Sequence, residues 1–109
     1  MINIKEFDKL DLRVGTILKA DLLKDTNKPS YLLEIDFGKI GIKRSSAQIA
    51  ELYKPNELVG IQIIAVVNFP PKRIAGIKSE VLVLGANNNN ENVVLLEPQK
   101  NISNGAKVG

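Results

Sequence analysis

The sequence predicts an all-β fold, and three observations carry this prediction. Apolar and polar residues alternate along several stretches, which is the period of half-buried strands. Turn-forming residues (Gly, Pro, Asn and Asp) separate these stretches. Apolar residues make up 44% of the 109 residues, which is enough to form a core, and this length suits one ordinary domain over residues 1–109.

The N-terminal region predicts a short helix followed by a long strand. Ile4, Phe7 and Leu10 have the spacing of a short amphipathic helical turn. From Leu10 to Leu22 the even-numbered positions are mostly apolar, which predicts a long strand with that set facing inward. Gly15 lies within this strand and indicates a bulge or a sharp bend.

Two further strands and a helix are expected next. Tyr31–Phe37 and Ile40–Ser45 alternate in the same way, and a tight connection around Gly38 joins them. The segment Ser46–Tyr53 predicts a short helix, which Ser45 or Ser46 would cap and Lys54-Pro55 would end.

The middle of the chain combines a buried strand with a proline-containing loop. Ile61–Val67 is almost continuously apolar, so we expect a fourth strand that is buried on most of both faces. The segment Asn68–Ser79 contains two adjacent prolines and is expected to be an irregular loop rather than sheet.

The C-terminal third supplies the last expected strands. Glu80–Ala86 reads as the fifth strand, the asparagines at 87–90 as a polar turn, and 93–98 as a last short strand. Five principal strands, a short helix between the third and the fourth, and a short N-terminal helix give the order of an OB-fold, a five-stranded Greek-key barrel. A small β-sandwich is the competing architecture.

Composition excludes several kinds of site. The chain has no cysteine and no histidine. Disulfides and thiolate metal sites are therefore excluded, and the commonest general base and metal ligand are absent. No stretch is long and apolar enough to cross a membrane, and the start does not resemble a signal peptide. We expect a cytoplasmic binding protein with no catalytic residue, metal or cofactor, rather than a small enzyme that uses carboxylates or lysine.

Positive charge is concentrated in the middle of the chain. Residues 39–80 hold seven basic and three acidic residues, whereas the flanking thirds are nearly balanced. The proline-containing loop displays basic and hydrogen-bonding side chains from a stiff base, which suits phosphates or acidic peptides. Its candidate binding residues are Asn68, Phe69, Lys72, Arg73, Lys78 and Ser79. An ordinary solvated connection is the alternative.

A second candidate cluster lies where the third strand would meet the helix. It consists of Lys43, Arg44, Ser45 and Ser46. Helix N-termini favour anions, although plain capping by the serines explains the pattern equally well. Arg13 is expected to pair with Asp11 on the sheet surface.

Excess apolar residues predict a two-fold interface. One small barrel does not need both faces of the 61–67 strand buried within itself. We therefore expect a homodimer whose interface is formed by the surplus apolar surface of this strand, of the N-terminal apolar residues and of the 93–96 strand.

Three ordered blocks carry a resemblance to a known family. The segments Leu10–Ile17 and Asn68–Glu80 resemble the opening strand and the basic proline loop of the tRNA-binding OB domain, which is appended to some methionyl-tRNA synthetases. The segment Ile40–Ile49, with 66–71 and 79–85, is similar to the CsaA family of export-related chaperones within that group. The resemblance covers nearly the whole chain.

The resemblance implies an OB-fold homodimer that binds unfolded or precursor polypeptides for the protein-export machinery, together with a capacity to bind tRNA. The tRNA-binding members usually carry an arginine just before the loop glycine, where this chain has Ala75. A chaperone is therefore the first hypothesis. A tRNA-binding protein that acts through its basic surface is the second.

Overall fold

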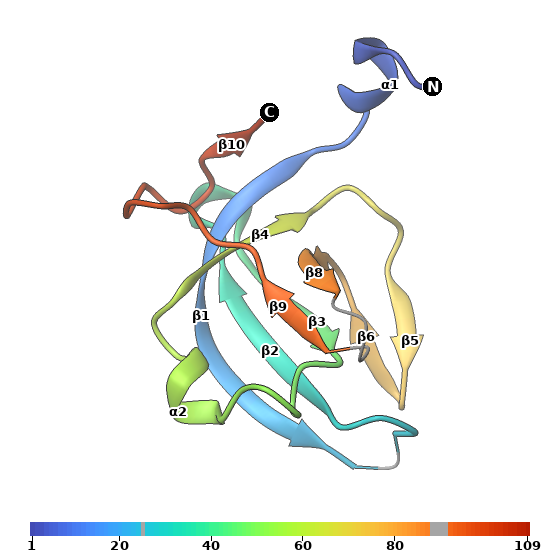
Figure 1. Ribbon diagram of the computed structural model, residues 1–109, viewed down its shortest axis with the longest axis vertical. Helices are drawn as coiled ribbons and strands as arrows, with labels where there is room; N and C mark the ends of the chain where they lie inside the picture. The colour runs from blue at the N-terminus through green and yellow to red at the C-terminus, as the bar shows by residue number, and fades with distance from the viewer. Residues whose placement is uncertain (25, 88–91) are drawn as a thin grey trace.

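The long strand β1 (Leu12–Leu23) lies at the centre of a curled antiparallel sheet (Figure 1). The computed structural model describes residues 1–24, 26–87 and 92–109. The sheet has the strand order β3-β2-β1-β4-β7, and β10 pairs with the start of β1. The other strands of the sheet are β2 (Ser30–Asp36), β3 (Ile42–Ala47), β4 (Gln62–Val66), β7 (Leu82–Val83) and β10 (Lys107–Val108).

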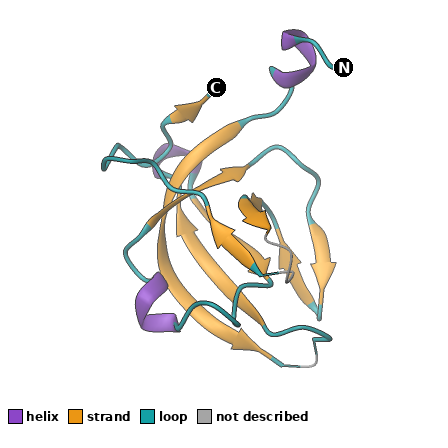
Figure 2. Cartoon of the chain, viewed as in Figure 1, coloured by secondary structure: helices purple, strands orange, loops and turns teal. Residues whose placement is uncertain are grey.

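Two hairpins and three short helical segments complete the fold (Figure 2). The hairpins are β5 (Lys72–Ile74) with β6 (Ile77–Ser79), and β8 (Gly85–Asn87) with β9 (Val93–Leu95). The helical segments are α1 (Ile4–Phe7), the 3₁₀ turn η1 (Gly38–Ile40) and α2 (Pro55–Leu58). The predicted all-β, OB-type fold with two short helices is confirmed. Of the asparagine turn, positions 88–90 fall outside the described residues.

A bulge in β1 changes which residues face the core. Leu12 and Val14 are buried as expected, but the register with β2 shifts between Ile17 and Lys19. Ile17, before the bulge, is fully buried, Leu18 is 44% exposed, and Ala20, beyond the bulge, is buried again. The prediction that the even-numbered set faces inward along the whole strand is therefore wrong: Gly15 and Ile17 face the core before the bulge, and the one extra residue returns the even-numbered Ala20 to the core after it.

Gly15 lets the central strand pass directly over the core. A Cβ atom at this position would lie 2.6 Å from Ile35 Cγ2 and 2.7 Å from the ring of Phe37, and both of those side chains are fully buried. A glycine is required here by packing, whereas the bulge itself lies two residues further along. The core beneath β1 is built from these buried apolar residues: Ile17, Ala20, Tyr31, Leu33, Ile35, Phe37, Ile49, Leu58, Ile63, Ala65 and Val81.

Hydrogen bonds bring β3 against residues 79–81 and so curl the sheet further. The Glu80 amide donates to the Arg44 carbonyl at 2.8 Å, and the Ser45 hydroxyl donates to the Val81 carbonyl at 3.0 Å. The Ser46 amide donates to Ser79 Oγ at 3.1 Å. These bonds hold the end of β6, and the two residues that link it to β7, beside β3.

The helix between the third and fourth strands is present, but it begins at Pro55 rather than at Ser46. Residues 48–53 form turns instead, because the tertiary contacts of this segment outweigh its helical pattern. The Tyr31 hydroxyl donates to the Tyr53 carbonyl at 2.7 Å, and Tyr53 Oη accepts from the Leu95 amide at 3.0 Å. Pro55 occupies the first helical turn, where its missing N–H costs nothing.

The segment predicted to be an irregular loop contains the hairpin β5–β6. Both prolines come before β5, so neither removes a hydrogen bond from the hairpin. The turn residues Ala75 and Gly76 have φ angles of +51° and +79°, which is the conformation of a two-residue hairpin turn. The pairing of the C-terminal β10 with β1 was also not predicted.

Candidate binding groove and its basic hairpin

A groove of about 400 Å³ lies between the β5–β6 hairpin, the residues that precede it and the start of β7. We call it the groove. Three of its lining side chains are large, apolar and substantially exposed: Phe69 is 45% exposed, Ile74 40% and Leu82 50%. Its full lining consists of Ser46, Phe69, Pro70, Pro71, Lys72, Ile74, Ser79, Glu80, Val81 and Leu82. The volume falls within the usual range of small ligand sites.

Asn68 holds the segment that forms one wall of the groove. Its Oδ1 atom accepts a hydrogen bond from the Asp11 amide at 2.9 Å, and its Nδ2 atom donates to the Lys9 carbonyl at 2.8 Å. Two prolines with restricted φ follow Phe69 directly. The backbone that carries Phe69 is therefore restricted before any partner binds, which reduces the entropy lost on binding.

The hairpin divides its side chains between two faces. Because residues alternate along a strand, Lys72 and Ile74 share the groove face, and Arg73 lies on the opposite face. Arg73 is paired directly with Lys78, so two positive charges lie side by side on that outer face. Among the described residues neither of the two has an ion-pair partner. The hairpin thus presents Ile74 and Lys72 to the groove, and two positive charges on its outer face.

Glu80 is the acidic residue of the groove lining and already has partners. Its Oε1 atom accepts from the Arg44 amide at 3.1 Å, and its Oε2 atom lies 4.0 Å from Lys43 Nζ. These contacts hold Glu80 against β3 and offset part of the positive charge on that strand.

The structure brings some of the predicted site residues together and separates others. Ser46, Phe69, Lys72 and Ser79 line the groove. Arg73 and Lys78 are exposed on the outer face of the hairpin, and Lys43 and Arg44 lie on β3 beside Glu80. Asn68 and Ser45 serve the fold instead: Asn68 ties the groove wall to the N-terminal segment, and Ser45 is buried against Val81.

The helix N-terminus expected at Ser45 and Ser46 does not exist, because both residues belong to β3. The prediction of an anion site at a helix N-terminus here is therefore wrong. The predicted pairing of Arg13 with Asp11 is confirmed: Arg13 Nε lies 2.6 Å from Asp11 Oδ1, and Arg13 Nη1 donates to the Gly105 carbonyl at 3.0 Å. Sequence reasoning missed Ile74, Val81 and Leu82 as groove residues. Their only signal was that apolar residues flank the basic loop.

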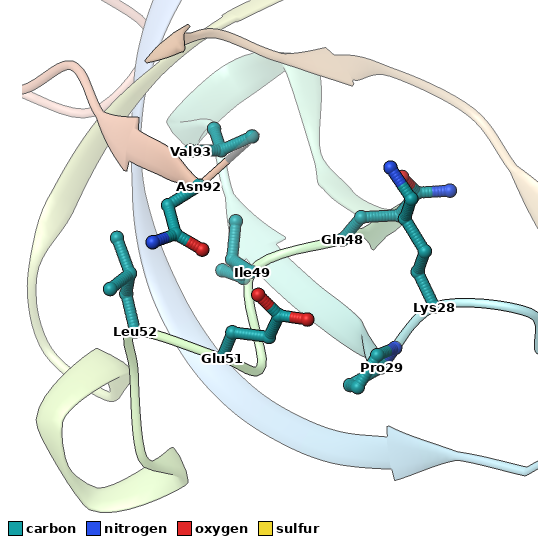
Figure 3. Close-up of a pocket in the computed structure, with 8 residues that line it drawn as sticks. All are labelled: Lys28, Pro29, Gln48, Ile49, Glu51, Leu52, Asn92 and Val93. Atoms are coloured by element: carbon teal, nitrogen blue, oxygen red, sulfur yellow. The ribbon is translucent and has the colours of Figure 1, made fainter. Parts of the chain in front are cut away.

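A second, smaller hollow of about 90 Å³ lies beside the turns that follow β3 (Figure 3). It is lined by Lys28, Pro29, Gln48, Ile49, Glu51, Leu52, Asn92 and Val93. This volume is well below that of typical ligand pockets. In the described part of the chain, no three Asp or Glu side chains gather as a metal-binding group. No helix within the same residues is long and apolar enough to cross a membrane.

Comparison with known proteins gives one family model and several close relatives. Residues 12–107 match the model described as a putative tRNA binding domain. The chain is 53% identical to the chaperone CsaA of Bacillus anthracis, with a TM-score of 0.95. The match covers 100% of this chain and 99% of the Bacillus anthracis chain. The CsaA chaperone protein of Picrophilus torridus is 50% identical, with a TM-score of 0.93, and both chains are covered completely.

Methionine–tRNA ligases are also related to this chain over part of their length. The enzyme of Methanothrix thermoacetophila is 39% identical over 108 residues, which is 99% of this chain and 16% of that protein. The chain therefore spans only about a sixth of the length of such relatives.

Proposed function

The chain belongs to the family of putative tRNA-binding domains and has CsaA chaperones among its near relatives, and from this premise we propose that it is a chaperone-like binding protein. It acts in the cytoplasm as a homodimer, without catalysis, and binds unfolded or precursor polypeptides on their way to the export machinery. The observation that carries the proposal is the groove, in which Phe69, Ile74 and Leu82 expose apolar surface around a hollow of about 400 Å³.

The groove suits unfolded polypeptide because it offers mainly apolar contacts rather than a set of polar groups whose geometry would select one particular ligand. An unfolded chain exposes the apolar side chains that a folded protein buries, and burying such a side chain contributes about 1.5–3 kcal/mol. Lining groups with fixed polar geometry would select one ligand, whereas a mainly apolar lining accepts many sequences. Lys72 at the rim adds attraction for acidic groups without restricting the sequence.

The N-terminal helix supports the proposed homodimer. No residue of α1 is buried, and Ile2 and Ile4 are 71% and 69% exposed. The helix also projects away from the sheet, near the C-terminal strand β10 (Figure 1). A second copy would cover this apolar surface and place two grooves on one particle, which can raise avidity by roughly 10²–10⁴-fold. A wild-type protein that sediments as a folded monomer at micromolar concentration would contradict the homodimer.

The groove is tested by titrating a reduced and alkylated, permanently unfolded polypeptide with Phe69→Ala and Leu82→Ala. Each side chain is already about half covered, so about half of its ~1.5–3 kcal/mol remains to be gained on binding. We expect each variant to weaken binding by about 4- to 12-fold. Val59→Ala is the matched control, because Val59 is an equally exposed apolar residue that does not line the groove. Equal affinity of all three variants would refute the groove as the binding site.

The outer face of the hairpin supports a second candidate function, the binding of tRNA. Arg73 and Lys78 are exposed on this face, and such side chains contact phosphate oxygens. If tRNA binds there, Lys78→Ala should weaken tRNA binding and reduce its salt dependence by about one phosphate contact. Phe69→Ala should leave the salt dependence unchanged. A Lys78→Ala protein with unaltered tRNA binding would argue against this surface.

A further inference from the structure

We propose that the polypeptide binds as an added β-strand along the free edge of β5, with its central residue hydrogen-bonded to the backbone of Arg73. The inference rests on the proposed polypeptide-binding function and specifies how the groove holds its ligand. The occupant is an extended segment that alternates apolar side chains with one acidic side chain beside Arg73. This mode of recognition takes its affinity from main-chain hydrogen bonds and its selectivity from side-chain pockets.

The register of the hairpin determines which backbone groups are free. Ile74 and Ile77 flank the two-residue turn, so they form the hydrogen-bonded pair next to it. Hydrogen-bonded and non-hydrogen-bonded pairs alternate along an antiparallel ladder. Lys72 and Ser79 are therefore again a bonded pair, and Arg73 and Lys78 between them are not. The N–H and C=O groups of Arg73 point away from β6, toward the outer edge of β5.

That outer edge has no strand beside it. Among the described residues β5 pairs with β6 alone, and Figure 1 shows β5 at the periphery of the molecule with β6 on its inner side. Pro70 and Pro71 lack N–H groups, so they cannot extend the ladder toward the N-terminus. The free edge therefore offers one complete pair of hydrogen-bonding groups, at Arg73, and an added strand has one defined register.

An added strand in this register would place its side chains where the structure has room and charge for them. The residue opposite Arg73 would have its side chain on the outer face beside Arg73, with Lys78 one strand further away on β6. Arg73 and Lys78 are like charges directly opposite each other, which is unfavourable, and an acidic residue next to Arg73 would offset this repulsion. The neighbouring residues of the ligand would point to the groove face, toward Ile74 and the apolar lining.

Arg73→Pro tests the proposal most sharply, because it removes the free N–H group and none of the hairpin hydrogen bonds. Proline is tolerated on edge strands whose N–H faces solvent. Arg73→Ala is the matched control, since it removes the charge and keeps the N–H. With a reduced and alkylated unfolded polypeptide as ligand, we expect Arg73→Ala to weaken binding by less than about threefold and Arg73→Pro by about tenfold or more. Equal affinities of the two variants, both folded by circular dichroism, would overturn strand addition.

A modified peptide tests the same hydrogen bonds from the ligand side and does not depend on the folding of the variant. The probe is a seven-residue peptide of leucines with one central glutamate and soluble flanking groups, N-methylated at one position at a time. Methylation of the glutamate nitrogen should weaken binding by about tenfold, and methylation of either neighbouring nitrogen by less than about threefold. Equal effects at all positions would overturn the proposal. If the unmodified peptide and the unfolded polypeptide both fail to bind wild-type protein, the proposed function itself is refuted. If they bind, and only Phe69→Ala weakens them, strand addition alone is refuted.

Discussion

Asn68 has a structural role, because its side chain holds one wall of the groove in place, and Asn68→Ala tests that role. The side chain joins the segment before the groove to the N-terminal segment through the Asp11 amide and the Lys9 carbonyl. Alanine removes both hydrogen bonds and leaves the groove wall attached by its backbone alone. If Asn68 were only a ligand contact, the same substitution would weaken binding without affecting the stability of the free protein.

The expected loss of stability follows from the two hydrogen bonds. A hydrogen bond between uncharged groups contributes about 0.5–1.5 kcal/mol net, and both of these lie near the surface, where water can replace the missing partner. The lower half of that range applies, so the two bonds together contribute about 1–2 kcal/mol to the free energy of unfolding. For a domain of this size, 1 kcal/mol corresponds to about 4–8 °C in melting temperature. We expect Asn68→Ala to melt about 4–16 °C below the wild type.

Thermal unfolding followed by circular dichroism measures this difference directly. Asn101→Ala is the matched control, because Asn101 is an exposed asparagine for which no hydrogen bond is seen within the described residues. The control should melt within about 1 °C of the wild type. An Asn68→Ala protein that melts with the control would refute the structural role and restore Asn68 as a candidate ligand contact.

Three further substitutions test the packing and backbone of the fold. Gly15→Ala places a Cβ atom 2.7 Å from the Phe37 ring and should destabilise by about 1–3 kcal/mol in urea unfolding, whereas an unchanged urea midpoint would contradict this contact. Ala75→Asn puts a residue that tolerates positive φ at +51° and should stabilise by about 0.5–1 kcal/mol, seen as a higher melting temperature. A lower melting temperature would argue against that backbone. Tyr31→Phe leaves the Tyr53 carbonyl without its 2.7 Å hydrogen bond and should cost about 1–3 kcal/mol, and a urea midpoint equal to the wild type's would show that this bond contributes nothing.

The strands could be predicted because their signal is local. Alternation places β1, β2 and β3, and a nearly continuous apolar run places β4, each within about two residues of its observed bounds. The change from Ile17 to Ala20 as the core-facing residues of β1 could not be predicted, since a bulge depends on pairing with β2 and not on composition. The two-residue strand β10 has no pattern of its own, and it forms because β1 lies beside it.

The misplaced helix has a physical reason of the same kind. The segment 46–53 has helical spacing, but Ile49 is buried in the core and Tyr53 is held by two tertiary hydrogen bonds. These contacts favour turns over a helix. In the basic loop the error is the opposite one, since the two prolines led to the prediction of an irregular loop where the structure has a hairpin. Both prolines lie before the hairpin and not within it.

The predicted binding loop coincides with one part of the groove, but the sequence does not predict the groove's full lining. The proline-containing loop was identified as the candidate binding segment, and Phe69 and Lys72 do line the groove. The groove lining also includes Leu82, which lies three residues beyond the loop in the sequence, and its position depends on its pairing with Val66 of β4. Which loop residues face the groove depends on the hairpin register, and the sequence alone does not give that register.

The most direct test of the account measures the affinity of the wild type and of Phe69→Ala combined with Leu82→Ala for two ligands, an unfolded polypeptide and tRNA, each at 50 and at about 200 mM salt. The account predicts that the wild type binds the polypeptide with little dependence on salt and that the double variant loses most of this binding. The contrary result is binding of tRNA alone, with the logarithm of the affinity falling by about one unit per unit of log salt for each phosphate contacted, in the wild type and the variant alike. That result would make the protein an RNA binder and leave the groove without the role proposed for it.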